Sequence, residues 1–229
     1  MANKFVHLHT HSHYSLLDGL GKIDDLIKRA GELGMDALAL TDHGAMYGAI
    51  EFYKKAKKAG IKPIIGCELY LAYEKMTDKR AGLDDKRYHL TVLAENKEGY
   101  QNLIQLVTKA HLEGFYYKPR VDKELLKQHS RGLIVLSGCF QSEIAKAVRA
   151  RKVDQAEELI REYQEIFGPD NFFLEIMPHH DGDDLVSIHQ TFAYLAQKTG
   201  APLVATNDVH YLRPEDAEAI LAGQKLLTK

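Results

Sequence analysis

The sequence of 229 residues contains no tryptophan, only two cysteines, and no continuous apolar run long enough to cross a bilayer. Two cysteines without a CxxC spacing, Cys67 and Cys139, and no secretory leader favour a reducing cytoplasm over a disulfide framework. The missing apolar run argues against a membrane partner. A formal net charge of -2 gives no basic excess, so affinity for phosphate must come from metals or local basic groups.

The remaining composition is typical of a soluble globular protein, with 45% apolar and 27% charged residues. The length suffices for one large core, and a β/α barrel can use it as a single domain. We find no internal repeat and no change of composition that would mark a second domain. We therefore expect residues 1–229 to form one domain.

Strand-like and helix-like segments alternate along the chain. This alternation predicts an α/β fold, specifically a distorted TIM-like (β/α)7 barrel. Two stretches interrupt the alternation: residues 74–87 are charged and predict a surface loop or hairpin, and residues 111–122 combine aromatics with a proline turn. The predicted strands are 4–9, 36–41, 61–72, 88–95, 132–137, 171–177 and 202–206, and the predicted helices are 23–34, 45–59, 97–112, 142–149, 153–167, 184–199 and 214–226.

Three histidines alternate strictly near the start of the chain, at His7, His9 and His11. A strand places alternate side chains on one face, so these imidazoles would lie together. Neutral imidazole is the commonest protein ligand for zinc and related metals, and the carboxylate of Asp18 follows closely. This cluster therefore predicts a metal site.

Further residues that bind metals recur where later strands are predicted to end. In β/α barrels, functional side chains gather at the carboxyl ends of the strands. His89 is the exception, because it lies early in its predicted strand. The residues at predicted strand ends are His9, Asp42, His43, Glu68, Cys139, Asp208 and His210.

An ordered set of motifs carries a family resemblance. The motifs are HTHSHYSLLDG, TDHG, GCELYLA, YHLTVLAENKEGYQNL, EGFYYKPRVD, SGC and NDVHY. They resemble the polymerase and histidinol phosphatase (PHP) domain, in the version at the N-terminus of bacterial replicative DNA polymerase III α subunits. The resemblance covers nearly the whole chain, and LAENKEGYQNL and GFYYKPR resemble the polymerase branch in particular.

The resemblance implies nine metal ligands, and none is missing here. It implies three divalent ions: one on His9, His11, Glu68 and Asp208; a second on Asp18, His43 and His210; a third on Glu68, His89 and Cys139. Glu68 would bridge two of them. Mixed nitrogen, oxygen and thiolate ligands favour zinc, iron or manganese over magnesium, and the thiolate favours zinc or iron.

Such a centre suits phosphoester hydrolysis. Two metals roughly 3.5 to 4 Å apart can hold a phosphate and lower the pKa of a bound water towards about 7. Ligating histidines also need an acceptor for their second nitrogen, and Asp42 and His7 are candidates for this role or for packing. The nine ligands are thus the expected catalytic residues, acting through bound metals.

Other polar residues have simpler interpretations. Cys67 is expected to pack in the core, and the pair His179 and His180 follows a predicted strand end in a loop that could contact substrate or solvent. Basic residues near the aromatics at 115–117 could bind phosphates and stack on bases, or pack against a polymerase body. These basic residues are Lys118, Arg120, Lys123 and Lys127; the histidines not expected to bind metal are His13, His111, His129, His179, His180 and His189.

The leading hypothesis is a metal-dependent phosphoesterase module of a replicative polymerase that trims DNA 3′ ends as a 3′-5′ proofreading exonuclease. Its partners would be the DNA end, the rest of the α subunit and other replisome subunits, in the cytoplasm. The break within ILAGQKLLTK suggests an excised domain without polymerase activity. Two alternatives stay open: a structural or interaction module with stabilising metals, and a stand-alone phosphatase resembling histidinol phosphatase.

Overall fold

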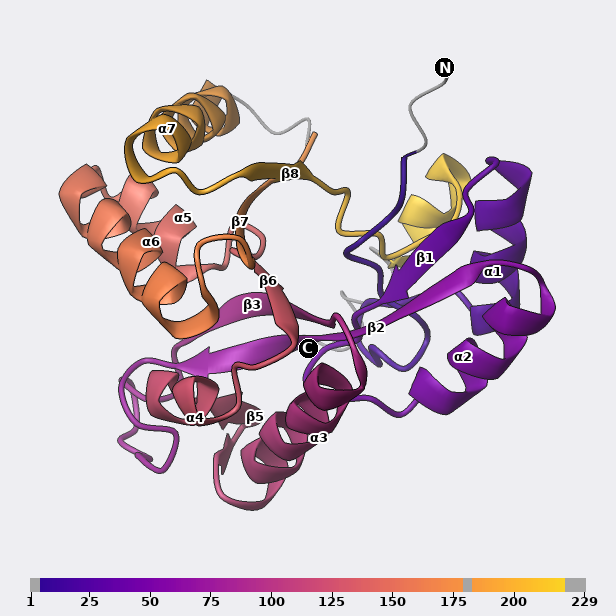
Figure 1. Ribbon diagram of the computed structural model, residues 1–229, viewed down its shortest axis with the longest axis horizontal. Coiled ribbons are helices and arrows are strands. Elements are labelled where there is room, and N and C mark those ends of the chain that lie inside the picture. The colour runs from indigo at the N-terminus through magenta and orange to yellow at the C-terminus, as the bar shows by residue number, and fades with distance from the viewer. Residues whose placement is uncertain (1–4, 179–182, 221–229) are drawn as a thin grey trace.

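The computed structural model describes residues 5–178 and 183–220, and it shows a curled sheet with helices packed on its outer side (Figure 1). The α/β class is therefore confirmed. The strands are β1 (Ala37–Leu40), β2 (Lys62–Ala72), β3 (Arg87–Ala94), β4 (Phe115–Tyr116), β5 (Lys118–Val121), β6 (Leu133–Leu136), β7 (Phe172–Ile176) and β8 (Leu203–Ala205). The helices are α1 (Ile23–Glu32), α2 (Ala49–Lys58), α3 (Lys97–Leu112), α4 (Lys123–Gln128), α5 (Glu143–Arg149), α6 (Val153–Phe167) and α7 (Asp183–Thr199).

Strand β2 is the organising element of the sheet. Within the described residues the order is β4-β5-β2-β3-β6-β7-β8, and β1 pairs with the first part of β2. The long β2 changes partners along its length, from β1 at Lys62–Ile65 to β5 at Tyr70 and Leu71. β3 runs antiparallel to both β2 and β6, whereas β6, β7 and β8 are parallel. A regular (β/α)7 barrel, in which all strands are parallel, is therefore not what this sheet forms.

The segment 7–11 lies between β1 and the chain that follows β8. Ala39 and Thr41 donate backbone hydrogen bonds to the carbonyls of His7 and Thr10, and Val209 exchanges bonds with His9 and His11. In this segment only Thr10 forms a β-bridge, with Val209. The strand predicted over residues 4–9 is therefore wrong, because the described residues 5–9 form no strand. The segment nevertheless has one sheet partner on each side, which fixes where its histidines lie.

The helices cover the outside of the sheet in two groups. Helix α1 places Ile23, Leu26, Ile27 and Ala30 at helical spacing, and they pack with α2 against β1 and β2. A larger core joins β2, β3, β6 and β7 to α3 and to the helices α4–α7. Both groups of helices thus leave one end of the strands free for a site.

Most predicted elements are present, with differences near the middle and the end of the chain. Helices α1–α3 and α5–α7 lie where the periodicity predicts them, whereas β4, β5 and α4 were not predicted. The predicted helix 214–226 begins as a 3-10 turn at Pro214–Asp216 with helical residues to 220, and the rest lies outside the described residues. No helix in the described part of the chain is long and apolar enough to span a bilayer.

The loop at 74–86 is held by one buried side chain, Arg120. Its guanidinium is fully buried and donates to the carbonyl oxygens of Met76, Asp78, Asp84 and Gly114, at 2.7 to 3.1 Å. The loop is therefore anchored to β5. The idea that Arg120 could grip phosphates is wrong, because its donors already serve the backbone.

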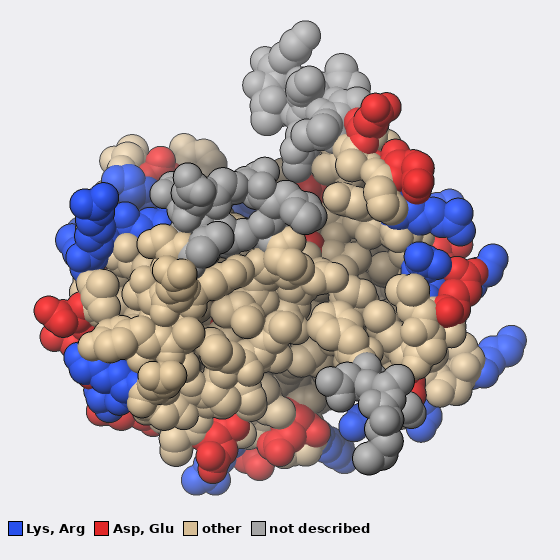
Figure 2. All heavy atoms as spheres, turned by 90° about the horizontal axis from the view of Figure 1, so that it is seen from above, with Lys and Arg blue, Asp and Glu red and all other residues tan. Residues whose placement is uncertain are grey.

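Charged side chains of both signs lie at the edge of the face shown in Figure 2, around a broad uncharged area. This face carries no continuous basic surface. The charged side chains that border this face are of both signs, in keeping with the near balance of basic and acidic residues in the sequence.

Candidate metal centre

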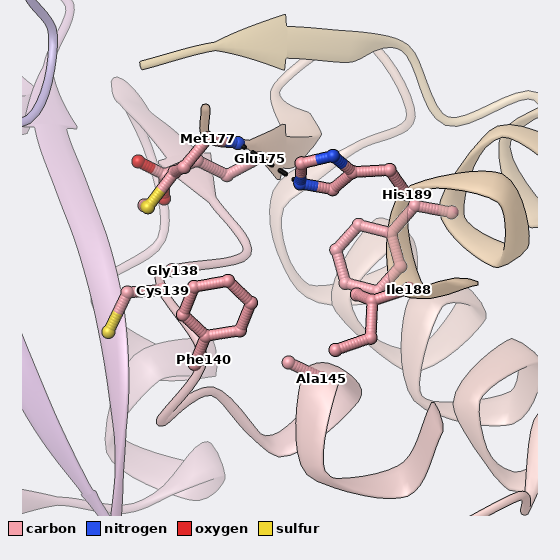
Figure 3. Close-up of a pocket in the computed structure, with 9 residues that line it drawn as sticks. Gly138, Cys139, Phe140, Ala145, Glu175, Met177, Ile188 and His189 are labelled. Atoms are coloured by element: carbon pink, nitrogen blue, oxygen red, sulfur yellow. Dashed lines mark hydrogen bonds between the residues drawn. The ribbon is translucent and has the colours of Figure 1, made fainter. Parts of the chain in front are cut away.

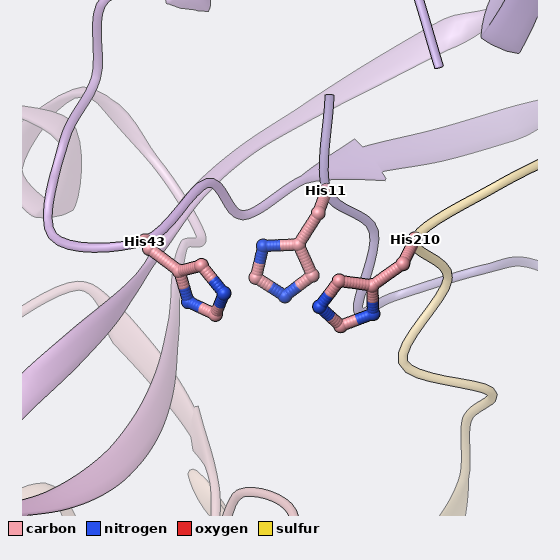
Figure 4. A group of neighbouring side chains, drawn as sticks. All are labelled: His11, His43 and His210. Carbon is pink, nitrogen blue, oxygen red and sulfur yellow. The ribbon is translucent and has the colours of Figure 1, made fainter. Parts of the chain in front are cut away.

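All nine predicted ligands lie in one cluster at the free end of the sheet. Each has a nitrogen, oxygen or sulfur atom within 3.9 Å of such an atom of another member. Figure 4 shows the rings of His11, His43 and His210 facing one another from three separate segments. The members are His9 and His11 before α1, Asp18 in the following loop, His43 after β1, Glu68 in β2, His89 in β3, Cys139 after β6, and Asp208 and His210 after β8.

Glu68 lies at the centre of the cluster and is fully buried. Its Oε1 is 2.9 Å from Nδ1 of His89, and its Oε2 is 2.5 Å from Nδ1 of His43. Its Oε1 also lies 3.4 Å from Nε2 of His9. His89 reaches Glu68 because β3 is antiparallel to β2, so the start of β3 lies beside the later part of β2. This direction explains why His89 is the one ligand found early in its strand.

Asp208 organises a second side of the cluster. Its Oδ1 lies 3.2 Å from Nε2 of His11 and 3.3 Å from Nε2 of His9. The backbone of Asp208 is in the left-handed region, at φ 46°, which aspartate tolerates better than most residues. This turn lets the Asp208 carbonyl accept a 2.8 Å hydrogen bond from Nδ1 of His210. Nε2 of His210 is thereby left for a ligand.

Asp18 completes the third side, where Nε2 of His43 lies 3.2 Å from its Oδ1 and Nε2 of His210 lies 3.9 Å from its Oδ2. Burial disfavours the charged form of His43, but its close contacts with Asp18 and Glu68 raise the pKa of His43 to about 10. His11 is the opposite case, since burial lowers its pKa to about 4 although Asp208 opposes this. The cluster therefore holds both a charged and a neutral imidazole in the absence of metal.

Cys139 approaches the cluster at the side of Glu68 and His89. Its Sγ lies 3.8 Å from Oε1 of Glu68 and 3.7 Å from Nδ1 of His89. Gly138 makes this approach possible, because a Cβ there would lie 2.6 Å from the carbonyl oxygen of His89 and its φ is +89°. Burial and then the charge of Glu68 raise the pKa of the Cys139 thiol. A cation is therefore needed to hold a thiolate here.

The unpartnered atoms of the cluster fit metal ions. Buried polar atoms cost free energy unless they are paired, and most in native proteins are paired. Here one atom from each of six clustered residues is buried and makes no well-aligned hydrogen bond with the described residues, although these atoms lie close to one another. A cation at their centre would supply the missing partner. The atoms are Nε2 of His9, Nε2 of His11, Oδ1 of Asp18, Nδ1 of His43, Oε2 of Glu68 and Oδ1 of Asp208.

Three groups in the cluster are compact enough to hold an ion. They are His11, His43 and His210; His9, His11 and Asp208; and His43, Glu68 and His89. They overlap with the grouping expected from the family. They differ in placing His11 beside His43 and His210, and in joining His43 to Glu68 and His89. His11 and His43 are thus each shared between two neighbouring groups.

Buried residues behind the cluster orient two of its histidines. Nδ1 of His9 is 2.8 Å from Oε1 of Glu175, which also accepts a 2.5 Å hydrogen bond from Thr206. Nδ1 of His11 is 3.0 Å from the Ser15 hydroxyl, which donates to Asp42 at 2.8 Å. Asp42 therefore helps to orient the ring of His11, through Ser15. Its place beside His43 in the sequence suggests His43 as its partner instead.

Glu175 was missed by the sequence analysis. It lies inside NFFLEIM, which was interpreted as a buried strand, and a carboxylate in such a strand was the available signal. His7 has a different environment, since its ring packs edge-on against Phe5 at 5.0 Å between centroids, away from the cluster. The pair His179 and His180 lies outside the described residues.

A cavity of about 670 Å³ opens directly onto the cluster, with Asp18, His43, His89, Asp208 and His210 on its floor. A second pocket behind Cys139 is only about 10 Å³, room for about one water. Figure 3 shows this small pocket, where Nε2 of His189 accepts a hydrogen bond from the Met177 amide. Of these two pockets, the larger one has room for a substrate beside the cluster.

Comparisons with known proteins identify the family of the chain. Residues 7–179 match the PHP domain family. The chain is 49% identical over 232 residues to the DNA polymerase III subunit alpha of Thermus aquaticus, covering 98% of this chain and 19% of that protein. It is 49% identical over 216 residues to the subunit alpha of Treponema pallidum, covering 94% and 18%. The chain thus spans about a fifth of the length of these relatives.

Two solved structures share the fold. An amidohydrolase from Chromobacterium violaceum has a TM-score of 0.57 at 17% identity, covering 95% of this chain and 96% of its own. A Bifidobacterium adolescentis protein described as a metal-dependent phosphoesterase has a TM-score of 0.54 at 13% identity, with the same coverage. At these identities the likeness concerns the fold alone.

Proposed function

Because the chain belongs to the PHP domain family, we propose that it is a metal-dependent phosphoesterase that hydrolyses DNA 3′ ends as a 3′-5′ proofreading exonuclease. One observation carries this proposal. Nine residues with metal-binding side chains converge from separate segments beside an open cavity, and six of them have buried atoms that make no well-aligned hydrogen bond within the described part of the chain.

The proposed ligands are all nine clustered residues, His9, His11, Asp18, His43, Glu68, His89, Cys139, Asp208 and His210. Catalytic sites use about three protein ligands per ion, so nine ligands suit a centre of about three ions. The mixed donor set favours zinc, manganese or iron. The family grouping, with Glu68 shared by two ions, agrees with the central position of Glu68 between His9, His43 and His89.

The chemistry divides between the ions and the chain. Bound divalent ions would polarise a phosphoryl oxygen and supply hydroxide from water near neutral pH. The residues of the chain hold their donor atoms in place: Glu175 fixes the ring of His9, and Ser15 fixes that of His11. The burial of His9, His11 and Glu68 keeps bulk water from competing for these donor atoms.

The relatives suggest the larger context. We propose that residues 1–229 are a single PHP domain within a polymerase α subunit, with the ring of strands and segment 7–11 as its distorted barrel. The partners would then be the rest of the α subunit and other replisome subunits, in the cytoplasm. The identities of 49% to two such subunits support this, and no polymerase activity is expected from this chain.

The test is cleavage of single-stranded DNA carrying a 5′ label, by protein loaded with zinc or manganese. Wild-type chain should shorten the strand from its 3′ end, and Asp18→Asn and His43→Ala should each abolish this. The matched control is His129→Ala, since His129 contacts Asn102 far from the cluster and its loss should leave cleavage unchanged. Cleavage that persists in Asp18→Asn would overturn the assignment.

A structural role is the second candidate, favoured by the burial of the cluster. His9, His11 and Glu68 are fully buried, so ions bound there would stabilise the fold whether or not they act on substrate. Under this alternative, Asp18→Asn would lower the melting temperature of a chain that never cleaved DNA. Faster turnover of histidinol phosphate than of DNA ends would instead favour a phosphomonoesterase.

A further inference from the structure

The wall of the 670 Å³ cavity has a chemistry of its own, separate from the cluster on its floor. It carries two cations, Arg87 and Lys118, and a set of ring side chains, which we name the aromatic wall: Tyr47, His111, Phe115 and Tyr117. We propose that this wall is a subsite for the unpaired end of a nucleic-acid strand, which stacks bases on the rings and holds a phosphate with the cations. The inference rests on the proposed function, because it places a phosphodiester beside the cluster.

Both cations lie over the ring of Tyr70. The guanidinium of Arg87 is 5.6 Å and Nζ of Lys118 is 5.5 Å from the ring centroid of Tyr70. Tyr70 in turn lies beside His43 and His89 of the cluster, at 6.0 and 5.2 Å between centroids. The cations are therefore within reach of a strand whose end contacts the cluster.

Neither cation forms an ion pair with a carboxylate in the described part of the chain. Within the described residues, Nε of Arg87 is buried without a hydrogen-bond partner, and Nη1 donates to the backbone carbonyl of Asp85. Three cations elsewhere in the molecule, Lys55, Arg80 and Lys123, each contact two or more carboxylates. The charge of Arg87 and Lys118 is therefore available to an anion in the cavity.

Three side chains of the aromatic wall are largely exposed to solvent, unlike the side chains of the hydrophobic core. Tyr47 is 63%, Phe115 50% and Tyr117 68% exposed. His111 lies between Tyr47 and Phe115, at 6.4 and 6.5 Å between centroids, and its Nε2 donates to the carbonyl of Gly44 at 2.9 Å. That hydrogen bond joins the wall to the residue next to His43. Three rings of the wall are thus neighbours, and His111 connects them to the residue beside His43.

The occupant that fits this combination is single-stranded nucleic acid. Stacking needs a base whose face is free, which a paired base inside a duplex does not offer. A phosphate is the anion that repeats beside every base, and unpaired cations next to exposed rings are the usual chemistry of strand binding. A protein segment would not need two unpaired cations at this place, so we favour the strand.

Binding of a short fluorescein-labelled deoxythymidine oligonucleotide, measured by anisotropy in EDTA, tests the subsite without cleavage. Stacking of one base contributes enough binding free energy that Tyr47→Ala and Phe115→Ala should each raise the Kd at least about fivefold. Tyr47→Phe should keep wild-type binding, which separates stacking from misfolding. The matched control is Tyr53→Ala, which removes another exposed tyrosine, on α2 and outside the cavity, and should change nothing.

The salt dependence tests the cations. Removing one phosphate contact should lower the slope of log Kd against log salt by about 0.7. Lys118→Ala should show this change, and Lys57→Ala, on the outer part of α2, should not. An unchanged slope in Lys118→Ala would remove the phosphate from this subsite.

Cleavage of bis(4-nitrophenyl) phosphate by metal-loaded protein separates the two proposals, because this small diester does not need the wall. If wild type cleaves it and oligonucleotide binding is absent or equal in wild type and Tyr47→Ala, the subsite is wrong and the phosphoesterase stands. The wall would then be a protein contact. If Tyr47→Ala and Phe115→Ala weaken oligonucleotide binding and no diester is cleaved, the subsite stands and the phosphoesterase fails.

Discussion

Glu175 shows how much of the centre depends on residues that are not themselves proposed ligands. It is buried in β7 and holds the ring of His9 through a 2.8 Å hydrogen bond, while Thr206 and Thr91 hold Glu175. Such partners fix the tautomer of a ligating histidine and raise its basicity. The orientation of His9 therefore depends on a carboxylate that comes from the opposite part of the chain.

Glu175→Gln should lower metal affinity by about 10- to 100-fold, because the amide keeps the shape of the carboxylate and loses its charge. Competition with a chromogenic zinc chelator measures this directly. Glu165→Gln, an exposed change on α6, is the matched control and should leave affinity unchanged. Equal affinities in wild type and Glu175→Gln would mean that Glu175 only fills space.

The clustering of the nine residues could be predicted, partly from residue types at strand ends and in full from the family resemblance. The residues that support them are harder to find. A carboxylate in the buried strand NFFLEIM is unusual, but nothing in NFFLEIM or in PLVAT says which side chain faces His9. A hydrogen bond between residues 166 positions apart leaves no local pattern.

At the level of elements, Arg120 links β5 to the loop at 74–86. Its four hydrogen bonds go to backbone carbonyls at 76, 78, 84 and 114. Arg87 begins the strand directly after this loop and contributes to the cavity wall. The position of the cavity wall thus depends on a side chain that does not line the cavity.

Arg120→Met should lower the free energy of unfolding by about 3 kcal/mol or more, since it leaves four carbonyls without donors. Urea unfolding measures the loss, and hydrogen exchange at residues 76–85 should rise in parallel. Lys127→Met, an exposed change on α4, should stay within about 0.5 kcal/mol of wild type. An equally small effect of Arg120→Met would show that the loop is held by other contacts.

The stability of the folded chain should depend on pH through Asp84, in the loop at 74–86. Hydrogen bonds from Arg80 lower the pKa of Asp84 from 3.8 to about 2. The folded state therefore binds fewer protons than the unfolded chain between these values, so the stabilisation is complete above about pH 4 and is lost as the pH falls towards 2. Asp84→Asn should be less stable than wild type at pH 6, and the difference should shrink as pH falls. Urea unfolding at several pH values tests this; a constant difference would contradict it.

Regular helices and buried strands could be predicted, because apolar periodicity decides them locally. The hairpin β4–β5 and helix α4 could not be, since strands of two and four residues are too short to show a period. The antiparallel direction of β3 was also not predictable, because direction depends on which strands pair. For the same reason the alternation of histidines at 7–11 predicted the wrong element, although it identified His9 and His11 as neighbours in the cluster.

For the whole molecule, the cluster joins segments from residue 9 to residue 210. Metal binding and folding should therefore be coupled, because the unfolded chain has no preformed site. Removing metal with EDTA should lower the melting temperature by about 5 to 10 °C, if free metal is near one hundred times Kd. Calorimetry tests this: zinc or manganese should restore the loss, and magnesium should not.

The central claim is that side chains from across the chain form one centre for several metal ions. The most direct measurement is elemental analysis of the chain purified without chelator. Nine ligands at about three per ion predict a ratio approaching three metals per chain in wild type, and a lower ratio in Glu68→Gln, which removes a charge from the middle of the cluster. A folded wild-type chain that binds no metal, or equal ratios in the two proteins, would contradict the account.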